Sequence, residues 1–486
     1  MNYRMVFNTT GKVLRVEGIL MLLPLLVSLI YREWIQVIAF SSTAIVVFII
    51  GFLLAKFLKP KNALLFAKEG LVTVALAWIS VSLFGAIPFV ISKDIPNYID
   101  ALFETVSGFT TTGASILTNI ESLSKGMLFW RSFTHWIGGM GVLVFILAIT
   151  SKTTDRSMHI LRAEMPGPII DKVVPKARKT SLILYIIYSA LTLALIVFLL
   201  CGGMSFYESI VHAFGTAGTG GFGIYNSGCA NFSPYIQWVL AIFMLLFGIN
   251  FNLYFLIIIG KIGSFFKSRE LWVYFGIIIC SVIIIAFNIF EMYGNFADVL
   301  RISVFQVSSI ITTTGFATVD FATWPALAKS VLLFLMFTGA CAGSTGGGFK
   351  ISRLIILIKK IGNDLKRVVH PRTTTVVKFE GKKLDNDTLN GVSSYFSVYV
   401  IIFIVVFILL SLDSGIAKEF AIETNLSAAL SCLNNIGPGF SLVGPMANYS
   451  LYSPFSKIIL SITMLIGRLE IYPILLTLNI ATWIKK

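Results

Sequence analysis

The sequence has 486 residues, of which 56% are hydrophobic and 13% charged, and its mean hydropathy is +0.87. Soluble domains carry about 25% charged residues, so this composition excludes a soluble globular protein and predicts a polytopic membrane protein. The formal net charge of +15 lies in short loops between apolar runs, which argues against nucleic-acid binding. The five cysteines show no metal-binding or disulfide spacing; they are Cys201, Cys229, Cys280, Cys341 and Cys432.

Two apolar spans come first, near 14–31 and 35–57, in an N-terminal unit over 1–69. After them one pattern occurs four times: a span, a shorter amphipathic segment, a glycine-containing stretch and a second span. These units cover 70–152, 181–265, 270–360 and 391–486. Such internal repetition predicts an all-α membrane protein in which four pseudo-symmetric repeats surround one pore. The expected total is ten spans and four re-entrant half-helices.

Each repeat is expected to begin with a full span, at 70–91, 181–203, 271–291 or 391–412. The short segments lie at 97–110, 205–218, 295–312 and 418–434. The second spans are expected at 127–150, 235–260, 326–358 and 453–483. A segment such as 97–110 reaches only about 21 Å at about 1.5 Å per residue, so it is too short to cross a bilayer and indicates a re-entrant half-helix.

Positive charge is distributed unevenly between the loops. Twenty-two lysines and arginines lie in one set of loops, at 56–69, 151–180, 260–270 and 359–390. Only four lie in the alternate set, at 92–125, 203–235, 292–325 and 413–455. Because basic loops face the cytoplasm, the first set and both chain termini are expected to be cytoplasmic. A docking face for a cytosolic partner is an alternative role for part of this charge.

The stretches after the short segments are rich in threonine and glycine, and Thr-Thr-Thr-Gly stands at both 110–113 and 312–315. Threonine favours extended backbone, and glycine adopts angles closed to other residues, so successive carbonyl oxygens can point the same way. Non-helical backbone at membrane depth is tolerated only inside protein or beside water. A polar turn between spans would explain one such stretch. Four stretches around one axis instead predict a filter whose carbonyls replace the water shell of a cation.

Aligning the four copies on one glycine gives the predicted filter residues. They are Thr111, Thr112, Gly113, Gly218, Thr219, Gly220, Thr313, Thr314, Gly315, Asn435, Ile436 and Gly437. The second copy has enough glycine for its register to slip by one residue. The four stretches contain no Asp or Glu, which argues against a divalent-selective carboxylate ring and favours a large, weakly hydrated monovalent cation.

The second span of the third repeat is too long and too rich in glycine for one regular helix. Residues 326–358 would reach about 50 Å as a helix, and five glycines stand from Gly339 to Gly348. Each glycine costs a helix roughly 1 kcal/mol relative to alanine, so a broken helix with a loop below the filter is expected. Tight glycine packing between helices is the alternative. The stretch is not a phosphate loop, because Phe349 stands where that motif needs lysine.

Two charges lie deep in the last span. Arg468 and Glu470 are two residues apart and share no helix face, so each is expected to have its own partner. Arg468 is either a buried structural group bonded to a carboxylate or to carbonyls, or a positive charge beside the pore that bonds to the glycine-rich loop. A further basic group near the third repeat is read as topology signals, lipid contacts or part of a docking face. Its members are Lys350, Arg353, Lys359 and Lys360.

Residues 70–486, with these four repeats, resemble the superfamily of potassium transporters that includes TrkH, KtrB and HKT. Members repeat an M1–P–M2 unit of span, half-helix with glycine strand, and span; the two leading spans here resemble the TrkH branch. The resemblance implies a single-chain pore that binds and passes K+, and also Rb+, in a bacterial inner membrane. It further implies a homodimer and a cytosolic TrkA-type ring of RCK domains that binds nucleotides such as NAD or ATP and controls opening.

The same resemblance implies an intramembrane loop that obstructs the pore beneath the filter. The corresponding gating residues are Gly343, Ser344, Thr345, Gly346, Gly347, Gly348 and Arg468. A gated, channel-like conduit is therefore one interpretation, and a symporter coupled to Na+ or H+ is the other. Symport would favour inverted repeats, whereas these repeats all begin at the cytoplasm. The sequence offers no nucleophile–base pair, metal cluster or nucleotide loop, so an enzyme is not expected.

Overall fold

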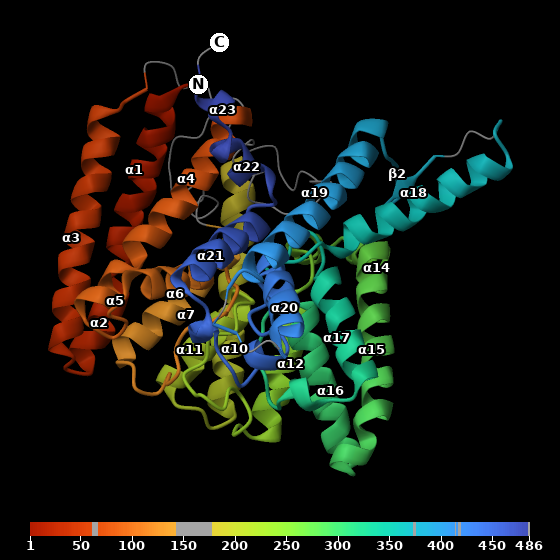
Figure 1. Cartoon of the computed structure of the whole chain (residues 1–486), viewed down its shortest axis with the longest axis horizontal. Helices are drawn as coiled ribbons and strands as arrows, with labels where there is room; N and C mark the ends of the chain where they lie inside the picture. Colours follow the sequence, from red (N-terminus) through yellow and green to blue (C-terminus); the bar gives the residue numbers. More distant parts are fainter. Residues whose placement is uncertain (61–66, 142–176, 373–375, 414, 417–418, 485–486) are drawn as a thin grey trace.

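The computed structural model describes the whole chain except residues 61–66, 142–176, 373–375, 414, 417–418 and 485–486. The described part is helical apart from one small hairpin of β1 (Lys378–Phe379) and β2 (Lys382–Lys383). Figure 1 shows the N-terminal helices on one side of the molecule and the third repeat on the other, with the half-helices of the other three repeats between them. Both chain termini lie at the same end.

The N-terminal unit is a pair of packed spans. Helices α1 (Tyr3–Leu20) and α2 (Leu22–Ile30) form one span, which lies against α3 (Trp34–Phe57). This span begins at Tyr3 rather than near residue 14, because the polar start of α1 is buried against α3: the Asn8 side chain donates to the carbonyl of Ala55 at 2.7 Å. The two helices meet at Gly11 and Gly51, where a Cβ on Gly51 would lie 2.6 Å from the Gly11 carbonyl oxygen.

The four repeats follow in chain order. The first contains α4 (Ala67–Gly85), α5 (Ile87–Ile91), α6 (Tyr98–Phe109) and α7 (Lys125–Gly139). The second contains α10 (Ala177–Cys201), α11 (Phe206–Ala217), α12 (Pro234–Phe247), α13 (Phe251–Ile258) and α14 (Ile262–Phe266). The third contains α15 (Arg269–Tyr293), α16 (Phe296–Ile311), α17 (Ala326–Thr338) and α18 (Ile351–Val369). The fourth contains α19 (Asn386–Leu410), α20 (Ala421–Asn434), α21 (Pro454–Arg468), α22 (Tyr472–Leu478) and α23 (Ile480–Trp483).

The predicted half-helices are present as α6, α11, α16 and α20. Three of them begin at a side-chain cap: Asn97 and Asn295 each accept a bond from a first-turn N–H, and Ser205 with Glu208 forms a full capping box. Their carboxyl ends are buried, so each half-helix directs its partial negative charge into the interior.

Six stretches of the described chain are long and apolar enough to cross a membrane. The bent pair α12 and α13 makes a seventh. These are mainly the N-terminal spans and the first spans of the repeats. The predicted total of ten requires that the broken second spans also be counted, so it stays a prediction.

Second spans are broken in three repeats, whereas the sequence predicted a break only in the third. α12 and α13 meet at 88° around Gly248, and α21 ends just before Ile471, whose φ is +69°. The loop between α17 and α18 explains the first break: it occupies the space below α12 and donates from Cys341 N–H to the Gly248 carbonyl. Pro473 at the start of α22 accounts for part of the second, because proline cannot continue a preceding helix.

We expect Gly51→Ala to lower the apparent melting temperature of the detergent-purified protein by several degrees. The added methyl group must displace backbone atoms of α1, and overpacking of this kind costs about 1–3 kcal/mol. Gly276→Ala is the matched control, since a Cβ there meets no atom within 4 Å. Equal melting temperatures for the two variants would contradict the close α1–α3 contact.

Candidate functional site

The four stretches after the half-helices share one backbone conformation. Each half-helix is followed by a non-glycine residue in the left-handed region, with φ between 55° and 60°. These residues are Thr111, Thr219, Thr313 and Asn435. A β-branched residue rarely adopts this conformation and is strained in it, so the surrounding structure must impose it. The strain occurs at the same point in the first three repeats, whereas Asn435 in the fourth tolerates this conformation more readily.

A glycine with positive φ stands two residues later in each copy: Gly113, Gly221, Gly315 and Gly437. In the second repeat this is Gly221 and not Gly220, so the alignment made from the sequence is wrong by one residue there. The equivalent triplet is Thr219, Gly220 and Gly221, while Gly218 is still helical and only ends α11. Because Gly220 and Gly221 are adjacent, the sequence alone could not fix the register of the second strand. The backbone angles identify Gly221 as the equivalent glycine.

The four strands form a closed ring. A Cβ on Gly113 would overlap the carbonyl oxygen of Gly220 in the next repeat. The same overlap occurs from Gly221 to Thr314, from Gly315 to Ile436 and from Gly437 back to Thr112. Each repeat therefore contacts the next at equivalent atoms, and the fourth contacts the first. This is the arrangement around one axis that the repeats predicted, and at these glycines no side chain fits.

The backbone N–H of the middle residue of each strand is paired within its own repeat. The middle residue of each strand donates to the carbonyl five residues earlier, in its own half-helix. These bonds are Thr112 to Ser107 (2.9 Å), Gly220 to Gly215 (2.8 Å), Thr314 to Ser309 (2.8 Å) and Ile436 to Ser431 (3.0 Å). In the first and third repeats a pair of threonine hydroxyls adds a second tie, at 2.7 and 2.8 Å. The strands are thus fixed to the half-helices that carry them.

The carbonyl oxygens of the same four middle residues have no such partner. Among the described residues, no hydrogen bond is donated to the carbonyl of Thr112, Gly220, Thr314 or Ile436, although all four residues are buried. Buried carbonyl groups in proteins are almost always paired. Four unpaired carbonyls at equivalent points of one ring can instead coordinate a cation that has shed water. On one side of the ring a hollow of about 140 Å³ is lined by residues of all four strands.

The glycine-rich loop between α17 and α18 packs against the ring. The N–H of Gly347 donates to the Thr313 hydroxyl at 2.7 Å, so the loop touches the third strand directly. The Thr345 hydroxyl donates to the Phe247 carbonyl at 3.2 Å, and Phe251 N–H donates to the Gly343 carbonyl at 3.0 Å. The loop is therefore held between the third and second repeats, as the expected break in this span requires.

Arg468 connects this loop to the first repeat. Its guanidinium donates to the Thr345 carbonyl at 2.8 Å, to the Gly139 carbonyl at 2.7 Å and to the Gly138 carbonyl. The remaining space beside it is a cavity of only about 30 Å³, lined also by Gly346, Gly347 and Gly348. With Arg468 from the fourth repeat, all four repeats meet below the ring.

Glu470 has a partner of its own, as its spacing from Arg468 predicted. It forms an ion pair with Arg353, whose guanidinium also lies 4.0 Å from the Tyr395 ring centre. Lys350 is 1% exposed and donates to the Gly346 carbonyl within the loop. The interpretation of Arg353 and Lys350 as lipid contacts or part of a docking face was therefore wrong, because both side chains are buried beside the broken helix. Their role as topology signals stays a prediction. Lys359 is half-buried and donates to the Lys378 carbonyl at 2.8 Å.

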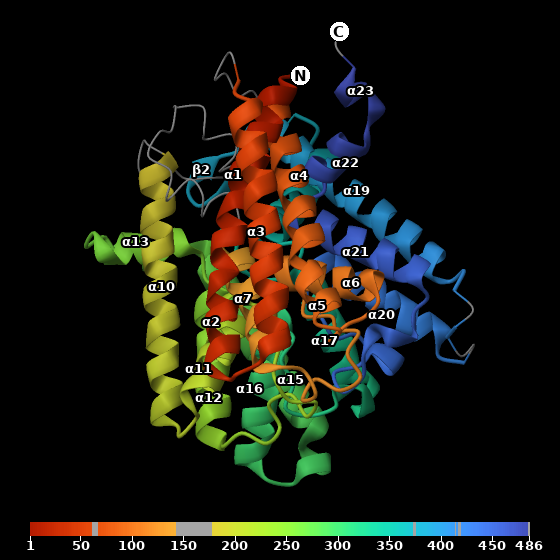
Figure 2. The ribbon, with the colours of Figure 1, turned by 90° about the vertical axis from the view of Figure 1, so that its left-hand side faces the viewer.

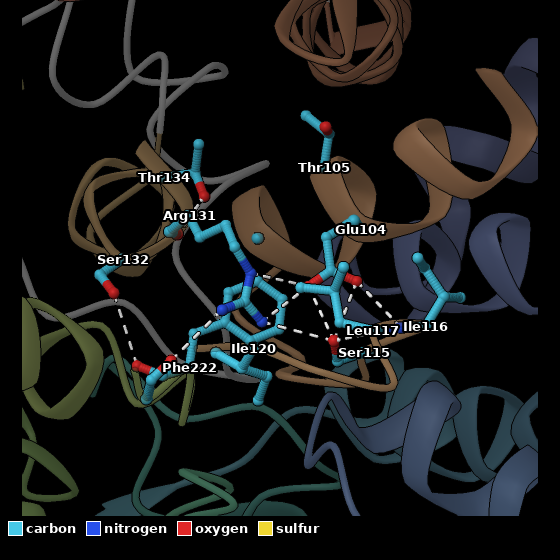
Figure 3. Close-up of polar contacts among 12 residues, drawn as sticks. Glu104, Thr105, Ser115, Ile116, Leu117, Ile120, Arg131, Ser132, Thr134 and Phe222 are labelled. Carbon is cyan, nitrogen blue, oxygen red and sulfur yellow. Dashed lines mark hydrogen bonds and ion pairs between the residues drawn. The ribbon is translucent and has the colours of Figure 1, made fainter. Parts of the chain in front are cut away.

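A buried ion pair that the sequence did not reveal ties the first strand to the second (Figure 3). Arg131 and Glu104 lie 2.7 Å apart with side chains only 1% and 0% exposed. Glu104 accepts the Ser115 hydroxyl at 2.9 Å and the Ile116 N–H at 3.0 Å, beyond the first ring glycine. Arg131 donates to the carbonyl of Gly223 at 3.2 Å, and Gly223 follows the ring glycine of the second repeat. In the sequence, this pair was indicated only by an acidic residue in the middle of a half-helix and a single arginine in a span.

We expect Glu104→Gln to lower the melting temperature strongly, because removing one partner of a buried pair leaves the other charge uncompensated at a cost of about 3–5 kcal/mol. The double variant Glu104→Gln with Arg131→Met should lose clearly less than the sum of the two single changes. Asp298→Asn, in a pair whose side chains are 20% and 39% exposed, is the control and should change little. Additive losses in the double variant would contradict the coupling.

Comparisons with known proteins agree on one family. The family model TrkH, described as cation transport protein, matches residues 36–482. The Trk system potassium uptake protein TrkH of Salmonella typhimurium is 35% identical and covers 99% of this chain and 100% of its own. The Trk system potassium uptake protein TrkG of Escherichia coli is 32% identical over 99% of this chain and 98% of its own.

The fold agrees as well. The crystal structure of the potassium transporter TrkH from Vibrio parahaemolyticus matches with a TM-score of 0.88 at 32% identity, and covers 100% of both chains. The relatives are named as transport proteins and not as enzymes, which confirms the prediction from the sequence that this chain is not an enzyme. This chain belongs to the TrkH family of cation transport proteins.

Proposed function

We propose that this chain conducts potassium, and also rubidium, across the membrane through the ring of backbone carbonyls. The observation that carries the proposal is the set of four buried carbonyl oxygens that accept no hydrogen bond, at Thr112, Gly220, Thr314 and Ile436. The names of the relatives support potassium as the ion: the Salmonella protein is called a potassium uptake protein, and the Vibrio structure is called a potassium transporter.

The chemistry of the ring favours K+ over smaller or divalent cations. Neutral carbonyl oxygens replace the hydration shell at least cost for an ion that holds its water weakly. None of the twelve residues of the four ring strands is acidic, so the ring offers no fixed negative charge for a divalent cation. The half-helix ends add a partial negative charge that favours a single positive ion at the centre.

We further propose that the loop around Thr345 and the Arg468 side chain form the gate. The loop lies directly against the third strand, and Arg468 holds it to the first repeat, so an ion leaving the ring meets a closed contact and a positive charge. Opening must break the three carbonyl bonds of Arg468. The alternative of symport with Na+ or H+ is not favoured, because the four repeats run in the same sense around the ring.

The predictions about partners and location remain part of the proposal. They are a homodimer, a cytosolic TrkA-type ring that binds nucleotides and controls opening, K+ bound in the filter, contact with membrane lipids, and a bacterial inner membrane with both termini cytoplasmic. The positions of the two termini at one end of the molecule fit the last of these.

Gly113→Ser and Gly315→Ser are each expected to lower K+ over Na+ selectivity, because a side chain at either position must displace a ring carbonyl of the next repeat. Ion competition for uptake in cells that lack other K+ uptake systems measures this. The matched control is Gly203→Ser, since Gly203 also has a positive φ (86°) but a Cβ there meets no atom within 4 Å. Unaltered selectivity in both ring variants, at normal membrane levels, would sink the filter assignment.

Arg468→Ala, and separately deletion of residues 345–347, should raise ion flux several-fold. Both changes remove the bonds that hold the loop under the ring, and the first also removes the positive charge. Flux is measured in reconstituted liposomes, with Arg301→Ala as a control at a partly exposed ion pair. Unchanged or reduced flux in correctly inserted protein would count against the gate.

A further inference from the structure

A second cavity lies beside the gate loop and contains none of the ring residues. Its volume is about 660 Å³, and it lies between α13, the start of α15 and the hairpin β1–β2. Ala342 and Ser352, at the two ends of the loop region, line one wall. Nothing in the proposed conduction path accounts for a cavity of this size at this place.

Four basic side chains line this cavity: Lys261, Lys267, Arg269 and Lys382. The first three are exposed and form no ion pair with any residue that the structure describes. This cluster of positive charge comes from the segment α13–α15 and from the hairpin, and it attracts an anion.

The two acidic side chains in the lining are already engaged by other donors. Glu270 accepts the N–H groups of Ala342 at 2.7 Å and Ser352 at 3.1 Å. Glu380 accepts the Ser268 hydroxyl at 3.2 Å and the Glu270 N–H at 2.9 Å. One oxygen of each carboxylate faces these donors, and the two acids are outnumbered by the four basic residues, so the lining carries net positive charge.

Two buried polar atoms in the lining have no partner among the described residues. They are the Ser352 hydroxyl and the Asn252 side-chain oxygen. Ser352 is only 1% exposed, so its hydroxyl has lost water without gaining a protein bond. A buried hydroxyl in this state costs about 1–3 kcal/mol, and an acceptor-rich occupant removes that cost.

One part of the lining, called here the apolar rim, consists of Leu253, Phe255, Leu256 and Ile259. Next to the lining residues in sequence, Ile258, Ile262, Phe266 and Trp272 are 53–68% exposed. The indole N–H of Trp272 donates to the Phe266 carbonyl at 2.7 Å. Figure 2 shows α13 lying across the direction of α10, as the 88° bend from α12 requires. A short helix lying across the bundle with basic and aromatic side chains is typical of the membrane interface.

We propose that this cavity binds the phosphate headgroup of an anionic phospholipid. The phosphate lies among Lys261, Lys267 and Arg269 and accepts from the Ser352 hydroxyl, while the acyl chains follow the apolar rim. The bound headgroup contacts the same wall through which Glu270 holds both ends of the loop region. Lipid binding at this cavity does not depend on conduction, so it can be tested independently of the proposed function.

The test is native mass spectrometry of the full chain in detergent, titrated with phosphatidylglycerol, phosphatidylcholine or inorganic phosphate. We expect phosphatidylglycerol to bind at least about tenfold more tightly than phosphatidylcholine, as several basic side chains near a membrane surface imply. The triple variant Lys261→Gln, Lys267→Gln, Arg269→Gln should abolish that preference. The matched control is Lys366→Gln, Arg367→Gln, Arg372→Gln, which removes equal charge outside the cavity.

Ser352→Ala should weaken phosphatidylglycerol binding several-fold and leave phosphatidylcholine binding unchanged. It distinguishes a headgroup in the cavity from diffuse attraction to the surface, and it removes only an unpaired hydroxyl. Equal affinities for the two lipids, or wild-type binding by the triple variant, would overturn the site. Binding of inorganic phosphate as tight as that of phosphatidylglycerol would overturn its assignment to a lipid.

Discussion

The rest of this structure depends on four buried backbone carbonyl oxygens that accept no hydrogen bond from the described residues. Leaving such groups buried is costly in any protein, and more so at membrane depth, where water is scarce. The half-helices, their i to i−5 bonds and the left-handed threonines all serve to hold these oxygens in place against that cost. A ring built this way has little freedom to collapse, and its unpaired carbonyl oxygens are the basis of the proposed cation site.

The ring and the loop beneath it form one mechanical unit. Gly347 bonds to the hydroxyl of Thr313, and Thr313 is itself one of the strained residues of the ring. Arg468 then links the loop to the carboxyl end of α7 in the first repeat. Because the contact includes residues of every repeat, movement of the loop changes the support of the ring from below.

The sequence predicted the architecture well, because repeats and apolar length are properties of the chain itself. The four half-helices and the break after Thr338 appear where the pattern placed them. The sequence did not predict the register of the second strand, because Gly220 and Gly221 are the same residue type and differ only in backbone angle. The break at Gly248 and the Glu104–Arg131 pair depend on contacts with distant segments, which no local pattern encodes. The break at Ile471 had a local signal in Pro473, which the sequence analysis did not use. The predicted part of the first repeat at 142–152 lies outside the described residues.

The central claim is that this ring is a passive path for K+. The most direct measurement is uptake of radioactive rubidium into liposomes that contain the purified protein and a K+ gradient, with no gradient of Na+ or H+. We predict uptake that runs under the K+ gradient alone and stops when that gradient is dissipated. An absolute requirement for a Na+ or H+ gradient would contradict the account and assign the ring to a coupled transporter.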